Sequence, residues 1–333
     1  VRQRVGIIDV SSLGKLDVRG ASAPALLDKV YTHHFSNLRV GRIRYGVLCS
    51  DNGTILDDGT VARLAEDRYF VTTTTGNVDL IEEWFKWWLA GTGTCAHVTN
   101  VTSAFAAMNV AGPRARQTLG KLTDIDLSSP AFRYMRSVQG MVAGVPAILL
   151  RIGFVGETGW ELHVPAESGE YLWEAIMEAG SEFGISPFGL EAQRILRLEK
   201  KHVIVGQDTD AVSNPLDTDM DWVVRFDKED FIGRGGLKAV SERGLRNKLV
   251  GFVMGDGLVP HDGDPVVLGR KPVGRVTSAR LSPTLGKGFG LAWVPIELAQ
   301  EGSRIDILVN GKRFEAEVTL RAFYDPEGER LRE

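Results

Sequence analysis

The chain has 333 residues, more than one hydrophobic core usually serves, so its length favours two or three domains. Apolar residues make up 43% of the sequence and charged residues 25%, which excludes disordered and collagen-like classes. The 39 Lys and Arg residues and the 43 Asp and Glu residues give a net charge of -4, a balance that argues against nucleic acid as a partner.

In chain order, the first hundred residues are predicted to mix short strands with helices. Asn77 is a residue type that caps helices, and we expect it to begin the second helix. That helix carries Trp84, Trp87 and Trp88, which are expected to pack against a sheet, with one of them left for a partner surface. The expected strands cover 5–10, 13–18, 45–49, 54–58 and 68–75, and the expected helices cover 21–27 and 77–89.

The remainder of the chain divides into a second mixed region and a β-rich region. Strands are expected at 103–110, 133–152 and 160–165, and helices at 169–179 and 188–200. From about residue 248, short β runs alternate with Gly, Pro and Asp turns, a pattern typical of a small all-β domain. The predicted fold class is therefore α+β, with two α+β units in residues 1–245 and a C-terminal β-barrel in residues 246–333.

Familiar cofactor and metal motifs are missing from the sequence. Gly91-Thr92-Gly93 has no third glycine in step, so it is no dinucleotide fingerprint. The six histidines show no zinc-type spacing with one another or with Cys49 and Cys95, which argues against a metal site. Two cysteines are too few for a disulfide framework, so we expect a cytoplasmic protein. Because no apolar stretch reaches the roughly 20 residues of a membrane span, no membrane partner is expected.

Two adjacent carboxylates are the first candidate for chemistry. The turn residues Asp51-Asn52-Gly53 predict a tight hairpin, which places Asp57 and Asp58 at the end of its second strand. Neighbouring residues of a strand point to opposite faces, so one carboxylate can enter a cleft while the other meets solvent or serves a turn. The residues alone leave open whether this happens or whether both are turn residues.

A second pair of carboxylates surrounds a predicted turn and strand. Glu157 lies in Gly156-Glu157-Thr158-Gly159 and is expected to be exposed at the turn. Glu161 alternates with Trp160 and Leu162, so it can point inward and bind a polar ligand or outward into solvent. The pattern does not decide between these two orientations.

Several short motifs along the chain, when taken together, are specific to one protein family. They are Val5-Gly6-Ile7-Ile8-Asp9-Val10, Leu13-Gly14-Lys15, Arg44-Tyr45-Gly46, Asp57-Asp58-Gly59, Thr73-Thr74-Thr75-Gly76, Gly156-Glu157-Thr158-Gly159-Trp160-Glu161, Leu196-Arg197-Leu198-Glu199-Lys200, Val205-Gly206-Gln207-Asp208-Thr209-Asp210 and Tyr324-Asp325-Pro326-Glu327-Gly328. From Val5 to its end, the sequence resembles the folate-dependent aminomethyltransferase family, which includes the glycine cleavage T-protein. Within that family it is most similar to the C-terminal half of the heterotetrameric sarcosine oxidase alpha subunit.

This resemblance implies a three-domain cloverleaf around a central cavity for tetrahydrofolate. The matching positions imply Asp57 as the catalytic acid beside the reacting folate nitrogen and Glu161 as the carboxylate that binds the pterin ring. They also imply Tyr45 as an aromatic lining residue and Tyr324 as a C-terminal contact. A carboxylate suits the adjacent N–H donors of a pterin edge, and a buried Asp suits the positive charge of an iminium.

Two positions depart from the glycine-cleavage branch. Gln193 replaces an arginine, so one ionic folate contact is missing or is supplied by the neighbouring Arg194. Thr74 replaces an asparagine after a strand. The resemblance still implies that Gln193 and Thr74 occupy folate-binding positions. Both replacements agree better with the sarcosine oxidase branch than with the glycine-cleavage branch.

The resemblance implies tetrahydrofolate-dependent transfer of a one-carbon unit. The donor is an iminium or formaldehyde equivalent of an N-methylated amino acid, the product is 5,10-methylenetetrahydrofolate, and a flavoprotein subunit is a candidate partner. Two alternatives stay open, a folate-dependent O- or S-demethylase and a non-catalytic folate-binding subunit.

Overall fold

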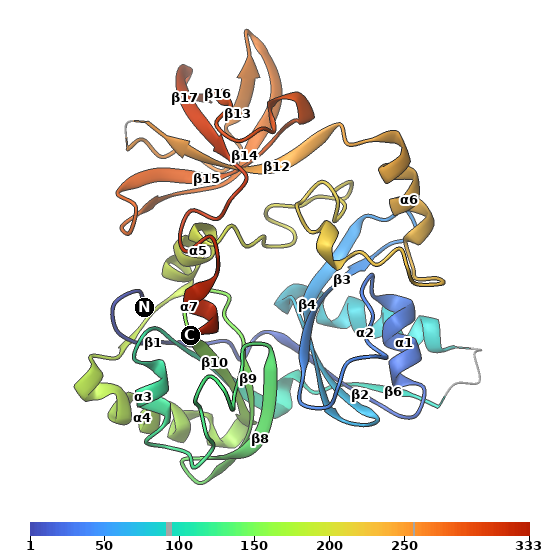
Figure 1. Cartoon of the computed structure of the whole chain (residues 1–333), viewed down its shortest axis with the longest axis vertical. Coiled ribbons are helices and arrows are strands. Elements are labelled where there is room, and N and C mark those ends of the chain that lie inside the picture. The colour runs from blue at the N-terminus through green and yellow to red at the C-terminus, as the bar shows by residue number, and fades with distance from the viewer. Residues whose placement is uncertain (91–94, 256) are drawn as a thin grey trace.

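The computed structural model describes residues 1–90, 95–255 and 257–333. They form two sheet-and-helix units and a β-barrel, arranged around a common centre (Figure 1). The predicted α+β class with a C-terminal barrel is confirmed.

The first sheet has the strand order β3-β4-β5-β2-β6 and is antiparallel throughout. Two amphipathic helices cover one of its faces, because Leu27 of the first helix and Phe85 of the second are buried in one core with Val61 of the sheet. The strands are β2 (Gly14–Arg19), β3 (Ile43–Cys49), β4 (Ile55–Ala65), β5 (Arg68–Thr73) and β6 (His97–Asn100), and the helices are α1 (Ala23–Val30) and α2 (Val78–Leu89).

The tryptophans of α2 divide as expected. Trp84 and Trp88 pack against the core of the first sheet, whereas Trp87 is 72% exposed. Asn77 precedes the helix, but its side chain makes no capping bond and instead donates to the carbonyl of Leu56 and to Oδ1 of Asp57, at 3.3 and 3.2 Å.

The second sheet has the strand order β11-β1-β7-β10-β9-β8, and it includes the first strand of the chain. Two helices cover one face, where Trp160 and Leu162 are buried together with Leu119 and Leu172. The strands are β1 (Gly6–Asp9), β7 (Phe105–Ala111), β8 (Arg136–Val142), β9 (Val145–Arg151), β10 (Gly159–Pro165) and β11 (Ser186–Pro187), and the helices are α3 (Ala115–Leu119) and α4 (Gly169–Gly180).

The third unit is a closed barrel whose first strand begins at Asn247. Its strands are β12 (Asn247–Met254), β13 (Pro265–Leu268), β14 (Lys271–Ser282), β15 (Lys287–Pro295), β16 (Arg304–Val309) and β17 (Lys312–Thr319). Helices α5 (Leu190–Glu199) and α6 (Arg234–Arg243) precede the barrel, and the short α7 (Glu329–Arg332) ends the chain.

A buried ion pair joins α5 to the barrel. Nη1 of Arg197 lies 2.5 Å from Oδ2 of Asp208, and both side chains are fully buried. Oδ1 of Asp208 also accepts hydrogen bonds from the hydroxyls of Thr277 and Ser278 on β14, at 2.7 and 2.5 Å. The barrel is therefore held to the rest of the molecule by a charged and hydrogen-bonded joint.

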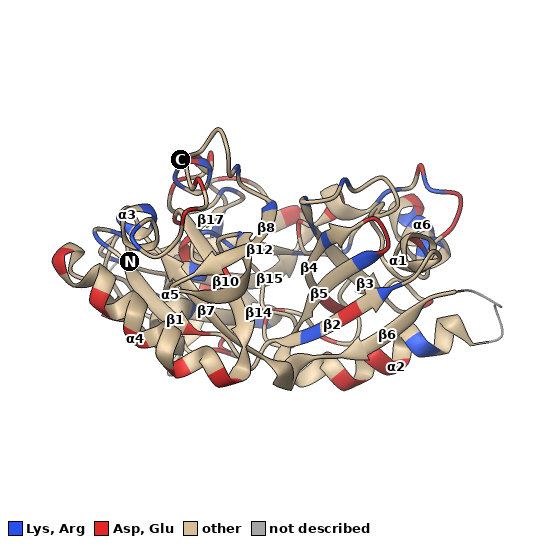
Figure 2. Cartoon of the chain, turned by 90° about the horizontal axis from the view of Figure 1, so that it is seen from below, with Lys and Arg blue, Asp and Glu red and all other residues tan. Residues whose placement is uncertain are grey.

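The charged residues show no separation by sign on the face drawn in Figure 2. Asp and Glu lie along the outer helices α2 and α4, with Lys and Arg interspersed around the molecule. Within the described ranges, no helix is both long and apolar enough to cross a membrane. Across the same residues, no group of three His, Cys, Asp or Glu side chains is placed to hold a metal ion.

Candidate functional site

The first sheet has an inner face that its helices leave uncovered. Residues directly opposite in a ladder share a face, and successive residues alternate between faces. Tyr45 is paired with Thr60 and Val47 with Asp58, while Leu48, paired with Asp57, belongs to the core under α1 and α2. Asp58 therefore lies on the inner face and Asp57 on the helix-covered face.

The second sheet has a corresponding inner face. Glu161 is paired with Asn109 on β7 and with Leu150 on β9, whereas Trp160 and Leu162 point into the core under α3 and α4. Glu161 is 6% exposed, so of the two orientations that the sequence left open, the structure shows the inward one.

The two inner faces meet through an apolar contact. Ala62 and Phe70 of the first sheet share a buried cluster with Ile148 and Leu150 of the second sheet. The ring of His163 meets the ring of Phe70 edge to face, with centroids 4.9 Å apart. Polar side chains also lie on these two inner faces, and we call Lys15, Tyr45, Asp58, Asn109 and Glu161 the inter-sheet site.

Asp58 is the carboxylate of the first sheet in this site. The hydroxyl of Tyr45 donates to its Oδ2 at 2.6 Å, and the ring of Tyr45 is stacked on Trp222, with centroids 5.7 Å apart. Burial raises the pKa of Asp58 to about 7, and the neighbouring charge of Asp57 adds to the shift. A carboxyl with this pKa can both accept and release a proton at neutral pH.

Asp57 has the contacts of a structural residue. Its Oδ2 accepts the backbone N–H of Thr74 at 3.0 Å, and its Oδ1 accepts the side-chain amide of Asn77 at 3.2 Å. The side chain is fully buried, and burial raises its pKa although these hydrogen bonds oppose the shift. Asp57 thus satisfies donors in the turn that leads into α2. These contacts favour Asp58, rather than the predicted Asp57, as the carboxylate that meets a ligand.

Glu161 is the carboxylate of the second sheet. Its Oε1 lies 2.8 Å from Nε2 of His163, and both residues are buried. Lys15, on the inner face of the first sheet, is fully buried and donates to the carbonyls of Ser11 and Leu13 at 2.9 and 2.7 Å. Burial lowers the pKa of Lys15 while the charge of Glu161 raises it, so the two charges are close enough to interact.

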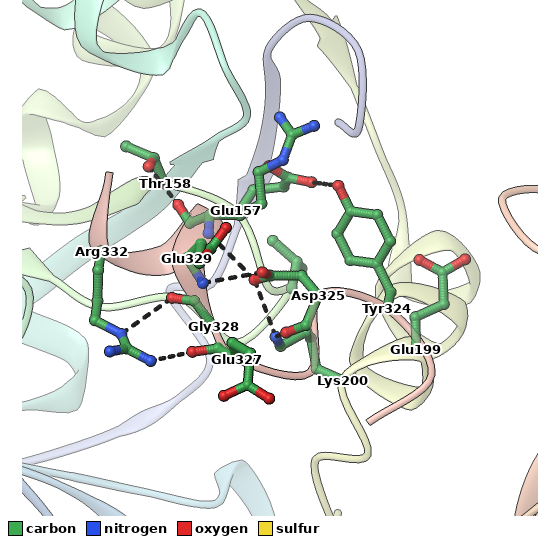
Figure 3. A network of polar contacts seen from close by, with 12 residues as sticks. Glu157, Thr158, Glu199, Lys200, Tyr324, Asp325, Glu327, Gly328, Glu329 and Arg332 are labelled. Carbon is green, nitrogen blue, oxygen red and sulfur yellow. Dashed lines mark hydrogen bonds and ion pairs between the residues drawn. The ribbon is translucent and has the colours of Figure 1, made fainter. Parts of the chain in front are cut away.

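Tyr324 takes part in a different network, drawn in Figure 3. Its hydroxyl donates to Oε1 of Glu157 at 2.9 Å, and the guanidinium of Arg2 lies 4.1 Å from the centre of its ring. Burial and the charge of Glu157 raise the pKa of Tyr324 to about 12. The prediction that Glu157 is exposed is wrong, because this side chain is 1% exposed and binds both Arg2 and Tyr324. The network joins the beginning of the chain to its C-terminal segment.

The remaining predicted residues do not converge on one point. Thr74 follows β5 and supplies the N–H that binds Asp57. Gln193 is half-buried on α5, and its side chain has no hydrogen bond to any described residue. The structure therefore brings Tyr45 together with Asp58, and Thr74 together with Asp57. Glu161 lies on the facing sheet, and Tyr324 lies in the C-terminal network.

Sequence reasoning missed three residues of this region. Lys15 belongs to the Leu13-Gly14-Lys15 motif, which indicated only the family resemblance. A lysine inside a predicted strand is itself a signal of a buried or functional cation. Asn109 lies in the otherwise apolar strand β7, and the sequence pattern did not indicate it as a candidate site residue. Trp222 lies in a short turn between longer elements, and nothing in the local pattern connects it to Tyr45.

Comparisons with known proteins agree with this architecture. The family model for the GCVT N-terminal domain matches residues 1–228, and that for the glycine cleavage T-protein C-terminal barrel domain matches residues 247–325. The chain is 34% identical to the aminomethyltransferase of Halothermothrix orenii, over 97% of this chain and 89% of that protein. The crystal structure of glycine cleavage system aminomethyltransferase T from Bartonella henselae shares the fold, with a TM-score of 0.89 at 23% identity over 98% of this chain and 88% of that one.

A second group of relatives is much longer. The chain is 39% identical to the sarcosine oxidase alpha subunit of Corynebacterium sp. (strain P-1), a match that includes 99% of this chain. The chain spans about a third of that subunit, 36% of its length.

Proposed function

Because the chain belongs to the glycine cleavage T-protein family, we propose that it is an enzyme that transfers a one-carbon unit to tetrahydrofolate. The donor is an iminium or formaldehyde equivalent of an N-methylated amino acid, and the product is 5,10-methylenetetrahydrofolate. The observation that carries the proposal is the inter-sheet site, which combines Asp58 of one sheet, a carboxyl whose pKa is raised to about 7, with the buried carboxylate of Glu161 on the other sheet.

The inter-sheet site suits the two ends of a reduced pterin. Glu161 is buried, and no described residue donates to its Oε2, so this oxygen can accept the N–H groups of a pterin edge. Tyr45 and Trp222 supply aromatic faces beside Asp58. Tetrahydrofolate supplies the nucleophilic nitrogens of the reaction, and the residues named here bind it and handle the protons.

Asp58 is the proposed acid–base residue. In its ionised form, it stabilises the cationic carbon of an iminium and takes a proton from the attacking amine nitrogen. Transfer of the methylene group removes two N–H protons from tetrahydrofolate, of which one goes to the departing amine and the other to solvent. Asp58 can perform both steps because its pKa is raised to about 7, and Tyr45 holds the carboxyl in place through its 2.6 Å hydrogen bond.

A flavoprotein is the proposed source of the one-carbon unit, since an N-methyl group must lose two electrons before it becomes an iminium. The similarity to a sarcosine oxidase alpha subunit supports this partner. Holding the iminium and the folate in one protein assembly would replace a bimolecular encounter in solution.

The test is product analysis. The chain is supplied with tetrahydrofolate, a flavin-dependent amine oxidase and sarcosine carrying a ¹³C-methyl group, and the labelled folates are identified by mass spectrometry. The labelled methylene derivative should form faster with the chain than with the oxidase alone. Labelled methyltetrahydrofolate from an O- or S-methyl donor would instead indicate a demethylase. Folate binding without any accelerated product would indicate a binding subunit.

A further inference from the structure

Asn109 is a buried polar side chain for which the described residues supply no hydrogen-bond partner. It lies on β7 and is 6% exposed. Its Oδ1 is sealed from solvent and accepts no hydrogen bond from any described residue, and its Nδ2 donates to none of them. Leaving a donor of a buried side chain unpaired costs about 1–3 kcal/mol, so the free Nδ2 of Asn109 is a group that an acceptor from outside the fold can satisfy, whereas the sealed Oδ1 faces away from any ligand.

The position of Asn109 in the sheet places it beside Glu161. It is the direct ladder partner of Glu161, so the two side chains project from the same face with Cβ atoms about 4.5–5.5 Å apart. Nδ1 of His163, two residues from Glu161 on the same face, is a second buried polar atom without a partner in the described part of the chain. Unsatisfied polar groups are therefore concentrated around Glu161.

The pair offers a defined pattern of acceptors and donors. The carboxylate of Glu161 presents acceptors, and its engaged Oε1 keeps a further lone pair, because a carboxylate can accept about four hydrogen bonds. The amide of Asn109 adds a donor beside them. The pyrimidinone edge of a pterin carries the complementary order, which is a 2-amino donor, an N3–H donor and a 4-oxo acceptor.

We propose that Asn109 is a specificity-determining residue that donates to the 4-oxo group of the pterin while Glu161 accepts from its 2-amino and N3–H groups. This inference rests on the proposed function, namely that the chain binds tetrahydrofolate. Asn109 thereby distinguishes 4-oxo pterins from their 4-amino analogues, because the analogues carry a 4-amino donor in place of the 4-oxo acceptor.

The test uses the full chain, calorimetry and two ligands, tetrahydrofolate and its 4-amino-4-deoxy analogue. Asn109→Leu removes the amide at nearly constant volume and should weaken tetrahydrofolate binding about tenfold, the scale of one lost hydrogen bond. Affinity for the 4-amino analogue should change less than twofold, so the preference for the 4-oxo ligand falls by about the same factor. Asn109→Ala is the second variant, in case leucine is not accommodated. Ser137→Ala is the matched control, since Ser137 is also buried on this sheet with an unpartnered hydroxyl.

The outcomes separate this inference from the proposed function. A wild-type chain that does not bind tetrahydrofolate would overturn both. A wild-type chain that binds it, together with folded Asn109 variants of unchanged affinity and preference, would overturn only the role of Asn109. An equal loss for both ligands would also contradict it, because that is the effect of a general structural disturbance.

Discussion

Replacing Asp58 by Asn is expected to slow one-carbon transfer strongly while it stabilises the folded chain. The amide keeps the size of the side chain and can still accept a hydrogen bond from Tyr45, but it cannot exchange a proton. Loss of a general acid–base group typically lowers a rate by about 10²–10⁴-fold, and we expect kcat to fall within this range with little change in folate affinity.

The stability effect follows from the raised pKa. Unfolded aspartate has a pKa of about 3.9, whereas that of Asp58 in the fold is raised to about 7. Between these values the folded state binds more protons than the unfolded state, so stability falls as pH rises from about 4 to 7 and levels off above it. At about 1.4 kcal/mol per pKa unit, the cost above pH 7 is on the order of 4 kcal/mol. Asp58→Asn removes this cost, so its advantage over the wild type should be largest at pH 8 and vanish near pH 4.

Asp57→Asn is the matched comparison. An amide offers one acceptor oxygen to the two donors that now bind Asp57, so this variant should lose about 1 kcal/mol of unfolding free energy and keep most of its rate. The assay follows methylenetetrahydrofolate formation from an iminium-generating oxidase, together with urea unfolding at pH 4 to 8. A slow Asp57→Asn beside a normal Asp58→Asn would refute the reasoning and restore the sequence-based assignment of Asp57.

Three further predictions concern other parts of the molecule. Glu161→Gln should weaken tetrahydrofolate binding by about 1–3 kcal/mol in calorimetry, and unchanged affinity would contradict the placement of the pterin. Trp222→Ala should raise the KM for tetrahydrofolate severalfold with almost no change in unfolding free energy, because the exposed indole stacks on Tyr45 but belongs to no hydrophobic core among the described residues. Arg197→Met should cost about 3–5 kcal/mol in urea unfolding because it leaves the buried charge of Asp208 without a counter-ion, and the double variant with Asp208→Asn, which removes that charge but keeps an acceptor for Thr277 and Ser278, should recover part of the loss.

The sequence predicted the architecture well because that information is local. Alternating apolar residues and turn signals place the strands, and the change of pattern after residue 248 marks the barrel whose first strand begins at Asn247. Glu157 shows where local information ends. A Glu between two glycines has the pattern of an exposed turn, yet it is buried because Arg2 and Tyr324, distant in sequence, meet it there.

Local sequence patterns are also insufficient to choose between Asp57 and Asp58 as the reacting carboxylate. Period-two alternation correctly separates the two carboxylates onto opposite faces, but it contains no information about which face the helices will cover. That is decided by α2, which packs on the side of Asp57 and needs acceptors for the donors of the turn before it, Thr74 and Asn77. Once Asp57 is engaged there, Asp58 is left on the inner face of the sheet with Tyr45. A carboxylate that binds the donors before a helix start is therefore first to be tested as a structural acceptor. Its neighbour on the inner face, where Asp58 has a pKa raised to about 7 and only Tyr45 as a hydrogen-bond donor among the described side chains, is to be tested as the reacting group.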